Sequence, residues 1–261
     1  MSTRAARVSP RLVLELARND FHVRYSGSVL GAVWSFAQPV LTILLYLFIY
    51  QVGFQSTPPD GVPFVLWLVV GIAPWFYFVD GMAMITCAFR EYSFLVKKVM
   101  FDVSVVPLIK LLSTTMIHVV VWTIVVAALV ANGAHPGLTW LEVPYYFAAM
   151  FALLFGLGRL TAILTPFFRD LEQVVLVGLQ FGFWITPVMW PIANAPEQYR
   201  WLLERNPVYY VVHGLRDALL LGHSLTTAPV EAAWFWGLVL ALHAVGAVLF
   251  AKLRPQLADV L

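Results

Sequence analysis

Residues 19–54 read NDFHVRYSGSVLGAVWSFAQPVLTILLYLFIYQVGF, and this stretch decides how the rest of the chain is interpreted. Asp20 and Arg24 are charged, and from Val29 onward a long run of residues is almost entirely apolar. About 20 apolar residues are enough for a helix to cross the hydrocarbon core of a bilayer. The stretch therefore predicts a membrane-spanning helix that follows a charged segment.

Polar and aromatic side chains fall on one side of this predicted helix. At about 100° per residue they occupy an arc of roughly 120°. They are Ser35, Gln38, Thr42, Tyr46, Tyr50 and Gly53. Because lipid tails offer no partner to polar groups, the stripe predicts contact with another helix or with a hydrated pathway.

The composition is that of an integral membrane protein. Of the 261 residues, 61% are hydrophobic and 11% are charged, and the mean hydropathy is +0.82. Soluble domains carry about 25% charged residues. The net charge of +2 gives no nucleic-acid footprint, and the single cysteine, Cys87, excludes an intrachain disulfide.

Apolar runs separated by turn signals predict an all-α integral membrane protein with one transmembrane domain over residues 1–261. We expect six transmembrane helices and an N-terminal amphipathic interface helix. The six spans are expected at about 33–54, 64–88, 104–131, 143–166, 173–190 and 232–251. Residues 90–102 are expected to form a polar cytoplasmic loop, and residues 191–225 are a long mixed segment with aromatic, proline and charged residues.

The amphipathic helix is expected over residues 9–25, where Ser9 and Pro10 provide an N-cap followed by proline at the first helical position. Arg11, Glu15, Arg18 and His22 form one polar face. Such a helix suits a membrane surface, with arginines toward lipid phosphates. The alternative is an ordinary cytosolic helix packed on protein.

The distribution of lysine and arginine sets the orientation. Thirteen of the 16 fall on the side of the N-terminus when that end is placed inside, and only Arg200, Arg205 and Arg216 fall outside. Both termini are therefore expected in the cytoplasm. The three outer arginines are close in sequence to acidic residues and are expected to pair with them; these are Glu197, Glu204 and Asp217.

Asp80, His118 and His243 are ionisable residues inside predicted spans. Asp80 follows Gly71 and Pro74 and precedes Gly81, which together suggest a broken helix that Asp80 caps. A functional role for Asp80 stays open, because a buried acid in a membrane is a functional candidate. His118 and His243 are expected to be hydrogen-bonded interior residues rather than ligands.

The chain lacks the motifs of several enzyme classes. It has no G-x-x-x-x-G-K-[ST], and indeed no Gly-Lys pair, so a P-loop of its own is excluded. H-E-x-x-H, C-x-x-C and G-x-S-x-G are also missing. We find no catalytic or metal-binding constellation, and expect no cofactor in this chain.

Four motifs resemble one family. R-Y-x-G-S-x-L-G-x-x-W-S-x-x-x-P at residues 24–39 is similar to the opening of the membrane subunit of polysaccharide-exporting ABC transporters, the type-2 exporter permeases. The resemblance continues in F-L-V-K-K-V-x-F at 94–101 with Pro107, in F-F-R-D-L at 167–171, and in 187–222 around Asn206-Pro207. One departure lies at 101–103, where Phe-Asp-Val stands in place of the family's frequent Phe-Pro-Arg.

The resemblance implies that the loop at 90–102 couples the permease to an ATPase, and that residues 191–225 form an outer gate segment with short re-entrant helices in the outer leaflet. Three groups of functional residues are therefore expected. A substrate pathway lined by aromatic and polar side chains is expected at Gln38, Thr42, Tyr46, Tyr50, Phe181, Trp184 and Trp190. Coupling to an ATPase is expected at Arg18, Glu91, Tyr92, Lys97 and Lys98. The outer gate is expected at Asn206, Pro207 and Arg216.

The function implied is ATP-driven export of lipid-linked polysaccharide across the bacterial inner membrane. The opening motif, with Gly27-Ser28 and Leu30-Gly31, is closer to O-antigen exporters than to capsule exporters. The implied assembly is a homodimer with two copies of an ABC ATPase, which binds ATP and Mg, and the implied substrate is an undecaprenyl diphosphate-linked polymer. Open alternatives are export of capsule or teichoic acid, a type-2 exporter of a drug or lipid, a lipid-embedded enzyme, and a structural scaffold.

Overall fold

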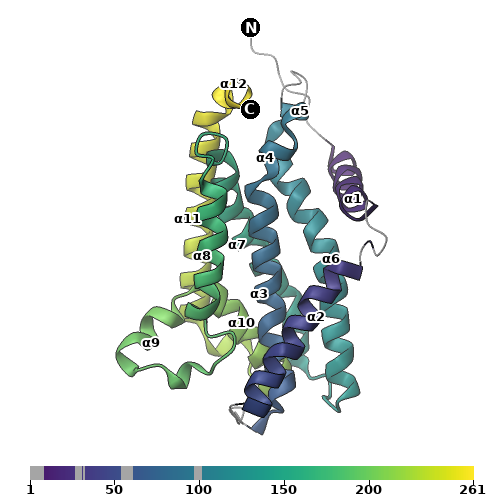
Figure 1. The fold of residues 1–261 in the computed structure, drawn as a ribbon. Coiled ribbons are helices and arrows are strands. Elements are labelled where there is room, and N and C mark those ends of the chain that lie inside the picture. The colour runs from purple at the N-terminus through teal and green to yellow at the C-terminus, as the bar shows by residue number, and fades with distance from the viewer. Residues whose placement is uncertain (1–8, 27–30, 32, 54–60, 97–101) are drawn as a thin grey trace.

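The computed structural model describes residues 9–26, 31, 33–53, 61–96 and 102–261. Every regular element in these ranges is a helix (Figure 1). The all-α fold class is therefore confirmed for the described part of the chain.

Long apolar helices make up the body of the molecule. Four helical segments are long and apolar enough to cross a bilayer. They contain α3 (Phe64–Thr86), α6 (Val106–Ala131), α7 (Val143–Leu164) and α11 (Pro229–Leu253). Short 3-10 turns lead into α6 (Val103–Val105) and into α7 (Leu138–Glu142).

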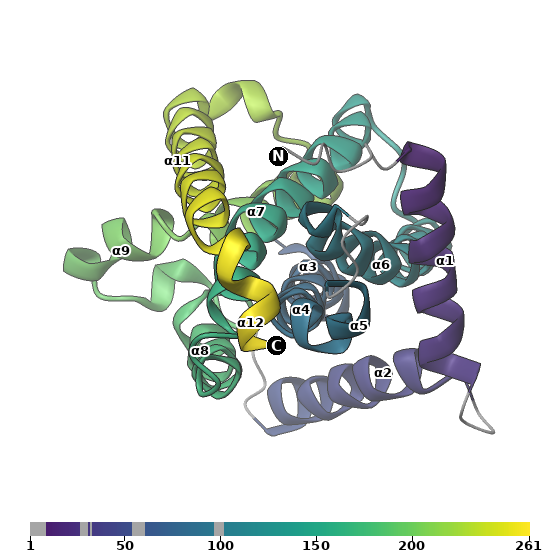
Figure 2. The same ribbon diagram turned by 90° about the horizontal axis from the view of Figure 1, so that it is seen from above.

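Two shorter apolar helices lie alongside these four (Figures 1 and 2). They are α2 (Val33–Leu47), which continues as a π-helical segment (Phe48–Gly53), and α8 (Leu171–Ile185). The predicted fifth span was expected to reach residue 190, but α8 ends at Ile185 because Pro187 favours an extended Thr186. The count of six membrane crossings stays a prediction.

Helix α3 is the centre of the fold. Its apolar window is 67% buried, the largest share among the four long helices. It packs against α6, α7, α8 and α2, and against α10 (Pro207–Arg216). The expected break in α3 is wrong, because the helix continues through Pro74 to Thr86. Gly71 and Gly81 permit close packing instead: an added Cβ on Gly71 would lie 1.9 Å from Nη2 of Arg216.

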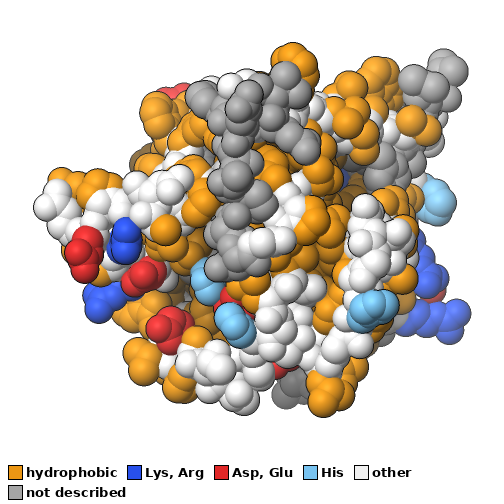
Figure 3. All heavy atoms as spheres, turned by 90° about the horizontal axis from the view of Figure 1, so that it is seen from below, with side chains coloured by type: hydrophobic (Ala, Val, Ile, Leu, Met, Phe, Trp, Pro, Cys, Tyr) orange, Lys and Arg blue, Asp and Glu red, His pale blue; other side chains and the backbone are white. Residues whose placement is uncertain are grey.

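The two ends of the molecule differ in their elements (Figure 1). One end carries α4 (Ala88–Glu91), α5 (Ser93–Val96) and α12 (Leu257–Val260), with α1 (Pro10–Ser26) at the side. The other carries α10, a π-helical segment (Asp217–Leu221) and α9 (Glu197–Glu204), where charged side chains gather (Figure 3). The expected short helices in 191–225 are therefore present, and their insertion into a leaflet stays a prediction.

Helix α1 packs on protein along one face. The Leu12 N–H donates to Ser9 Oγ at 3.3 Å, which confirms the predicted N-cap. Val13 and Ala17 are buried against Ile109 of α6, whereas Arg11 and Arg18 face outward. The packed face matches the alternative of a helix docked on protein. Contact of the exposed face with lipid stays a prediction.

Candidate functional site

A cavity of about 700 Å³ lies between α2, α3, α6 and α8. That volume is in the range of ligand sites, which measure about 300–1,000 Å³. Arg24, near the end of α1, reaches the same space. The polar side chains in its wall are Arg24, Thr42, Asp80, Thr114, His118, Gln173 and Gln180, and the aromatic ones are Trp34, Tyr46, Trp75, Phe76, Phe183 and Trp184.

The aromatic side of the cavity is a packed series of rings. The Phe183 ring centroid is 5.6 Å from that of Tyr46 and 5.6 Å from that of Trp75. Trp184 meets Phe183 edge to face at 5.5 Å. Because these rings come from α2, α3 and α8, their mutual packing holds the three helices around the cavity.

The polar side of the cavity contains a hydrogen-bonded pair, a buried histidine and an exposed carboxylate. His118 Nε2 lies 3.0 Å from Asp80 Oδ2. The His118 side chain is 2% exposed, whereas that of Asp80 is 54% exposed. The prediction that Asp80 caps a helix break is wrong, since it projects from the middle of a helical turn. The prediction of hydrogen-bonded interior histidines is confirmed, because His243 Nε2 also lies 3.0 Å from the Ala152 carbonyl oxygen.

The structure brings together some of the predicted pathway residues. Thr42, Tyr46 and Trp184 line the cavity. Tyr50 instead stacks on Phe64, with the ring centroids 5.7 Å apart. Phe181 is 67% exposed and does not line the cavity. The Trp190 Nε1–H donates to the Trp184 carbonyl oxygen. The side chain of Gln38 lies outside the described residues.

Sequence reasoning missed several of the residues that line the cavity. Gln173 and Gln180 are among them. They lie eleven and four residues before Trp184, which was predicted, and they share its face of α8. That spacing was a signal that could have found them. The meeting of Asp80 with His118 across two helices left no such signal, because it depends on the tertiary packing of α3 on α6.

A charged cluster ties α1 to α4 and α6. Lys110 Nζ lies 2.6 Å from Asp20 Oδ1 and 2.5 Å from Glu91 Oε2, and the Lys110 side chain is 4% exposed. Arg24 donates to Asp20 Oδ2 at 3.0 Å, and the Tyr92 hydroxyl donates to Asp20 Oδ1 at 2.8 Å. We call these five residues the Asp20 cluster. It joins three helices that are distant in sequence.

The Asp20 cluster keeps its central carboxylate ionised. Burial acts to raise the pKa of Asp20, but the hydrogen bond and charge of Lys110 outweigh burial and lower it. Hydrogen bonds from Ser113 and Tyr92 act in the same direction. The pKa of the Tyr92 phenol is raised, first by burial and then by its bond to Asp20. The pair therefore stays as carboxylate acceptor and phenol donor at neutral pH.

The predicted coupling residues divide into three sets. Glu91 and Tyr92 belong to the Asp20 cluster, so they hold the α4 segment against α1 and α6. Arg18 is exposed on α1. Lys97 and Lys98 lie outside the described residues.

The predicted outer gate residues lie at the two ends of α10. Asn206 Oδ1 accepts from the Val208 N–H at 2.9 Å, so Asn206 caps α10, and Pro207 occupies its first turn. Arg216 is the last residue of the same helix, and it is buried. It donates to the carbonyl oxygens of Trp67, Pro187 and Val188, and its guanidinium lies 3.4 Å from the centroid of the Trp67 ring.

The expected pairing of the outer arginines with acidic residues is wrong for the described contacts. Arg200 donates to the Ala195 and Ala193 carbonyls at 3.0 and 2.8 Å. Arg205 lies over the Trp201 and Trp234 rings. Backbone carbonyls bind Arg200, and aromatic faces bind Arg205. Proximity to acidic residues in the sequence could not reveal these partners.

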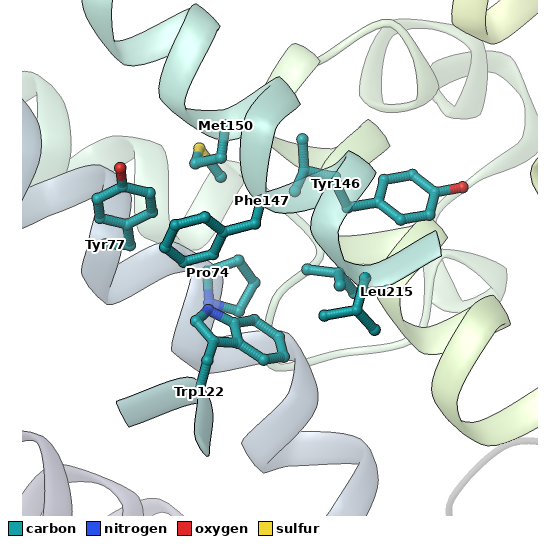
Figure 4. Close-up of a pocket in the computed structure, with 9 residues that line it drawn as sticks. Pro74, Tyr77, Trp122, Tyr146, Phe147, Met150 and Leu215 are labelled. Atoms are coloured by element: carbon teal, nitrogen blue, oxygen red, sulfur yellow. The ribbon is translucent and has the colours of Figure 1, made fainter. Parts of the chain in front are cut away.

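A second, much smaller space lies between α3, α6, α7 and α10 (Figure 4). Its volume is about 10 Å³, and Pro74, Tyr77, Trp122, Phe147 and Met150 surround it with apolar atoms. A water molecule needs about 10–15 Å³ and polar partners. This gap is therefore a packing feature, and the large cavity is the candidate site.

Comparison with known proteins decides the family. A family model described as ABC-2 type transporter matches residues 11–220. The chain belongs to the ABC-2 type transporter family. The match covers α1, the cavity helices and α10, and thus both the cavity and the Asp20 cluster of this ABC-2 transporter protein.

Curated relatives of this ABC-2 transporter protein extend over most of its length. It is 28% identical over 251 residues to the O-antigen export system permease protein RfbA of Klebsiella pneumoniae, covering 96% of this chain and 95% of the relative. It is 28% identical over 253 residues to RfbA of Myxococcus xanthus, covering 95% and 94%. The polysialic acid transport protein KpsM of Escherichia coli is 23% identical over 207 residues, covering 78% and 79%.

Proposed function

We propose that this chain is the transmembrane subunit of an ATP-driven exporter that moves lipid-linked polysaccharide of the O-antigen type across the bacterial inner membrane. The observation that carries the proposal is the cavity, whose wall combines aromatic rings with hydroxyl and amide groups. Sugar rings offer C–H faces that stack on aromatic side chains and hydroxyls that bond to amides. The O-antigen export permeases among the relatives support the same substrate class.

The proposed assembly is a homodimer with two copies of a separate ABC ATPase, which binds ATP and Mg. Six crossings with both termini in the cytoplasm place α4 and α5 on the ATPase side, and α9 and α10 on the outer side. One chain of 261 residues is small for an enclosed pore wide enough for sugars, which favours a dimer. The substrate is proposed to enter on an undecaprenyl diphosphate carrier.

The Asp20 cluster provides a route from the ATPase side to the cavity. Lys110, Thr114 and His118 follow at four-residue steps on one face of α6. Lys110 belongs to the cluster, and the other two line the cavity. Arg24 belongs to both. A push on α1 or α4 by the ATPase would therefore reach the cavity wall through directly bonded residues.

Gene deletion with complementation tests the function. Deleting the gene should remove the surface polysaccharide and leave lipid-linked polymer inside the cell, and the wild-type gene should restore export. Export that continues without the gene would contradict the proposal. Accumulation of a drug or a small lipid in place of polymer would favour a different type-2 exporter.

Coupling and topology are tested separately. Lys97→Glu with Lys98→Glu should weaken co-purification of the ATPase or uncouple hydrolysis from export, and unchanged assembly and export would remove that loop from the interface.

For topology, Cys87→Ser is combined with Phe94→Cys or Asn194→Cys, both exposed positions. An impermeant thiol reagent given access to the periplasm should label position 194 and spare position 94, and the reverse would overturn the orientation.

A further inference from the structure

The Asp80 carboxylate has unused hydrogen-bonding capacity inside the large cavity. Its Oδ2 is bonded to His118, and no other hydrogen bond to Asp80 is found among the described residues. The side chain is 54% exposed and lines the cavity. A carboxylate has about four acceptor positions, so several remain open to hydroxyl groups.

The carboxylate is held in a fixed orientation from behind. His118 is 2% exposed, and its ring centroid is 4.9 Å from that of Tyr77. The Tyr77 hydroxyl is bonded to Thr115 Oγ1 at 2.8 Å, so Tyr77 is held in turn. His118 Nδ1 is buried and has no hydrogen-bond partner among the described residues. The hydrogen bond of this ring is therefore the one from Nε2 to Asp80. His118 is thus a positioning residue for Asp80.

The groups around Asp80 match the surface of a sugar ring. Trp75, five residues before Asp80 on α3, lines the same wall of the cavity. The amides of Gln173 and Gln180 line the cavity from α8. Among the described residues, the acidic and basic side chains that line the cavity are Asp80, His118 and Arg24. Arg24 is already bonded to Asp20 and Ser113, so the charge left open to a ligand is the carboxylate.

We propose that Asp80 is a binding site for the hydroxyl groups of uncharged sugars and makes the cavity reject acidic ones. A carboxylate that accepts from two neighbouring hydroxyls forms strong, charge-assisted hydrogen bonds. A sugar carboxylate at the same place would instead meet a like charge where water is partly excluded. The inference rests on the proposed function and narrows its substrate class to polymers that are uncharged at the units passing Asp80.

Cysteine protection in the purified permease–ATPase complex tests this site. Ala83→Cys, in a Cys87→Ser background, places a thiol in the cavity wall one helical turn from Asp80. The rate of its alkylation by iodoacetamide is measured with increasing maltoheptaose, which is uncharged, or an oligogalacturonate of similar length, which is acidic. Maltoheptaose should slow alkylation, and oligogalacturonate should not.

Two substitutions then assign the selectivity. Asp80→Asn keeps the shape and a hydrogen bond to His118, and should raise the maltoheptaose concentration needed for half protection about tenfold. It should also let oligogalacturonate protect. Glu15→Gln removes a carboxylate from an exposed pair on α1 and should leave both titrations unchanged.

The outcomes separate this inference from the proposed function. Equal protection by the two probes in the unsubstituted Asp80 background overturns the inference without needing any variant. No protection by maltoheptaose, or identical titrations for Asp80→Asn, also overturns it while polymer export by the wild type still stands. Export that persists after deletion of the gene overturns the proposed function, and the protection experiment decides the Asp80 site independently.

Discussion

Lys110→Met is the substitution that most sharply probes the link between α1, α4 and α6. Lys110 is 4% exposed and lies 2.6 Å from Asp20 and 2.5 Å from Glu91. Methionine keeps the unbranched shape of the side chain and removes its charge. Glu91, whose side chain is 43% exposed, can turn to solvent, whereas Asp20 stays buried.

The expected loss follows from what remains around Asp20. Removing one partner of a buried ion pair costs about 3–5 kcal/mol when the other charge is left uncompensated. Asp20 keeps Arg24 at 3.0 Å and Tyr92 at 2.8 Å, so part of this cost is avoided. We expect the free energy of unfolding to fall by about 2–3 kcal/mol. A protein of this size loses about 2–4 °C of Tm per kcal/mol, so the Tm should fall by about 4–12 °C.

Thermal unfolding followed by tryptophan fluorescence measures the effect in the purified permease. Arg11→Met is the matched control, because it breaks a cation–carboxylate pair whose side chains are 90% and 57% exposed and should leave the Tm unchanged. Asp20→Asn combined with Lys110→Met should cost less than the two single substitutions added together, since the two residues are in direct contact. A wild-type Tm for Lys110→Met, or strictly additive losses, would refute the reasoning.

Three further predictions follow from the packing. Tyr46→Ala should reduce polymer export while ATPase co-purification is retained, and Phe181→Ala, outside the cavity, should leave export unchanged; equal loss from both would remove the cavity from the pathway. Gly71→Ala should lower the Tm by several degrees, because the added Cβ would lie 1.9 Å from a guanidinium nitrogen of the buried Arg216. Gly178→Ala, whose added Cβ would have no atom within 4 Å, should leave the Tm unchanged, and similar Tm values for the two variants would contradict the packing. The lowered pKa of Asp20 means that its contribution to stability is complete above the ordinary carboxyl pKa of 3.8 and is lost only as pH falls through the lower folded pKa. The Tm difference between wild type and Asp20→Asn should therefore be constant from about pH 6 to 8, and a steep change there would show that another group controls it.

Much of the fold could be predicted because it is set by local patterns. Apolar runs long enough to cross a bilayer gave the four long helices, and Ser9 gave the start of α1. The wrong prediction at Pro74 has a physical cause. Proline and glycine are read as helix breakers, but close tertiary packing around Gly71 keeps α3 continuous. Local propensity was outweighed by contacts that the sequence does not display.

The candidate site was predictable where one helix carried the whole signal. The stripe on residues 33–54 identified Thr42 and Tyr46, which do line the cavity. Tyr50 shares that stripe, yet it lies within the π-helical segment and stacks on Phe64 instead. The Asp80–His118 pair and the Asp20 cluster join residues 38 and 90 positions apart, so they appear only once the helices are packed.

Photocrosslinking of the moving polymer tests the central claim most directly. A benzophenone amino acid is placed at position 46, inside the cavity, or at position 181, on the exposed face of α8. The permease–ATPase complex is then illuminated while it exports polymer with ATP. The account predicts that polysaccharide becomes attached at position 46 in an ATP-dependent manner and that position 181 captures far less. Capture at position 181 with none at position 46 would contradict a pathway through the cavity.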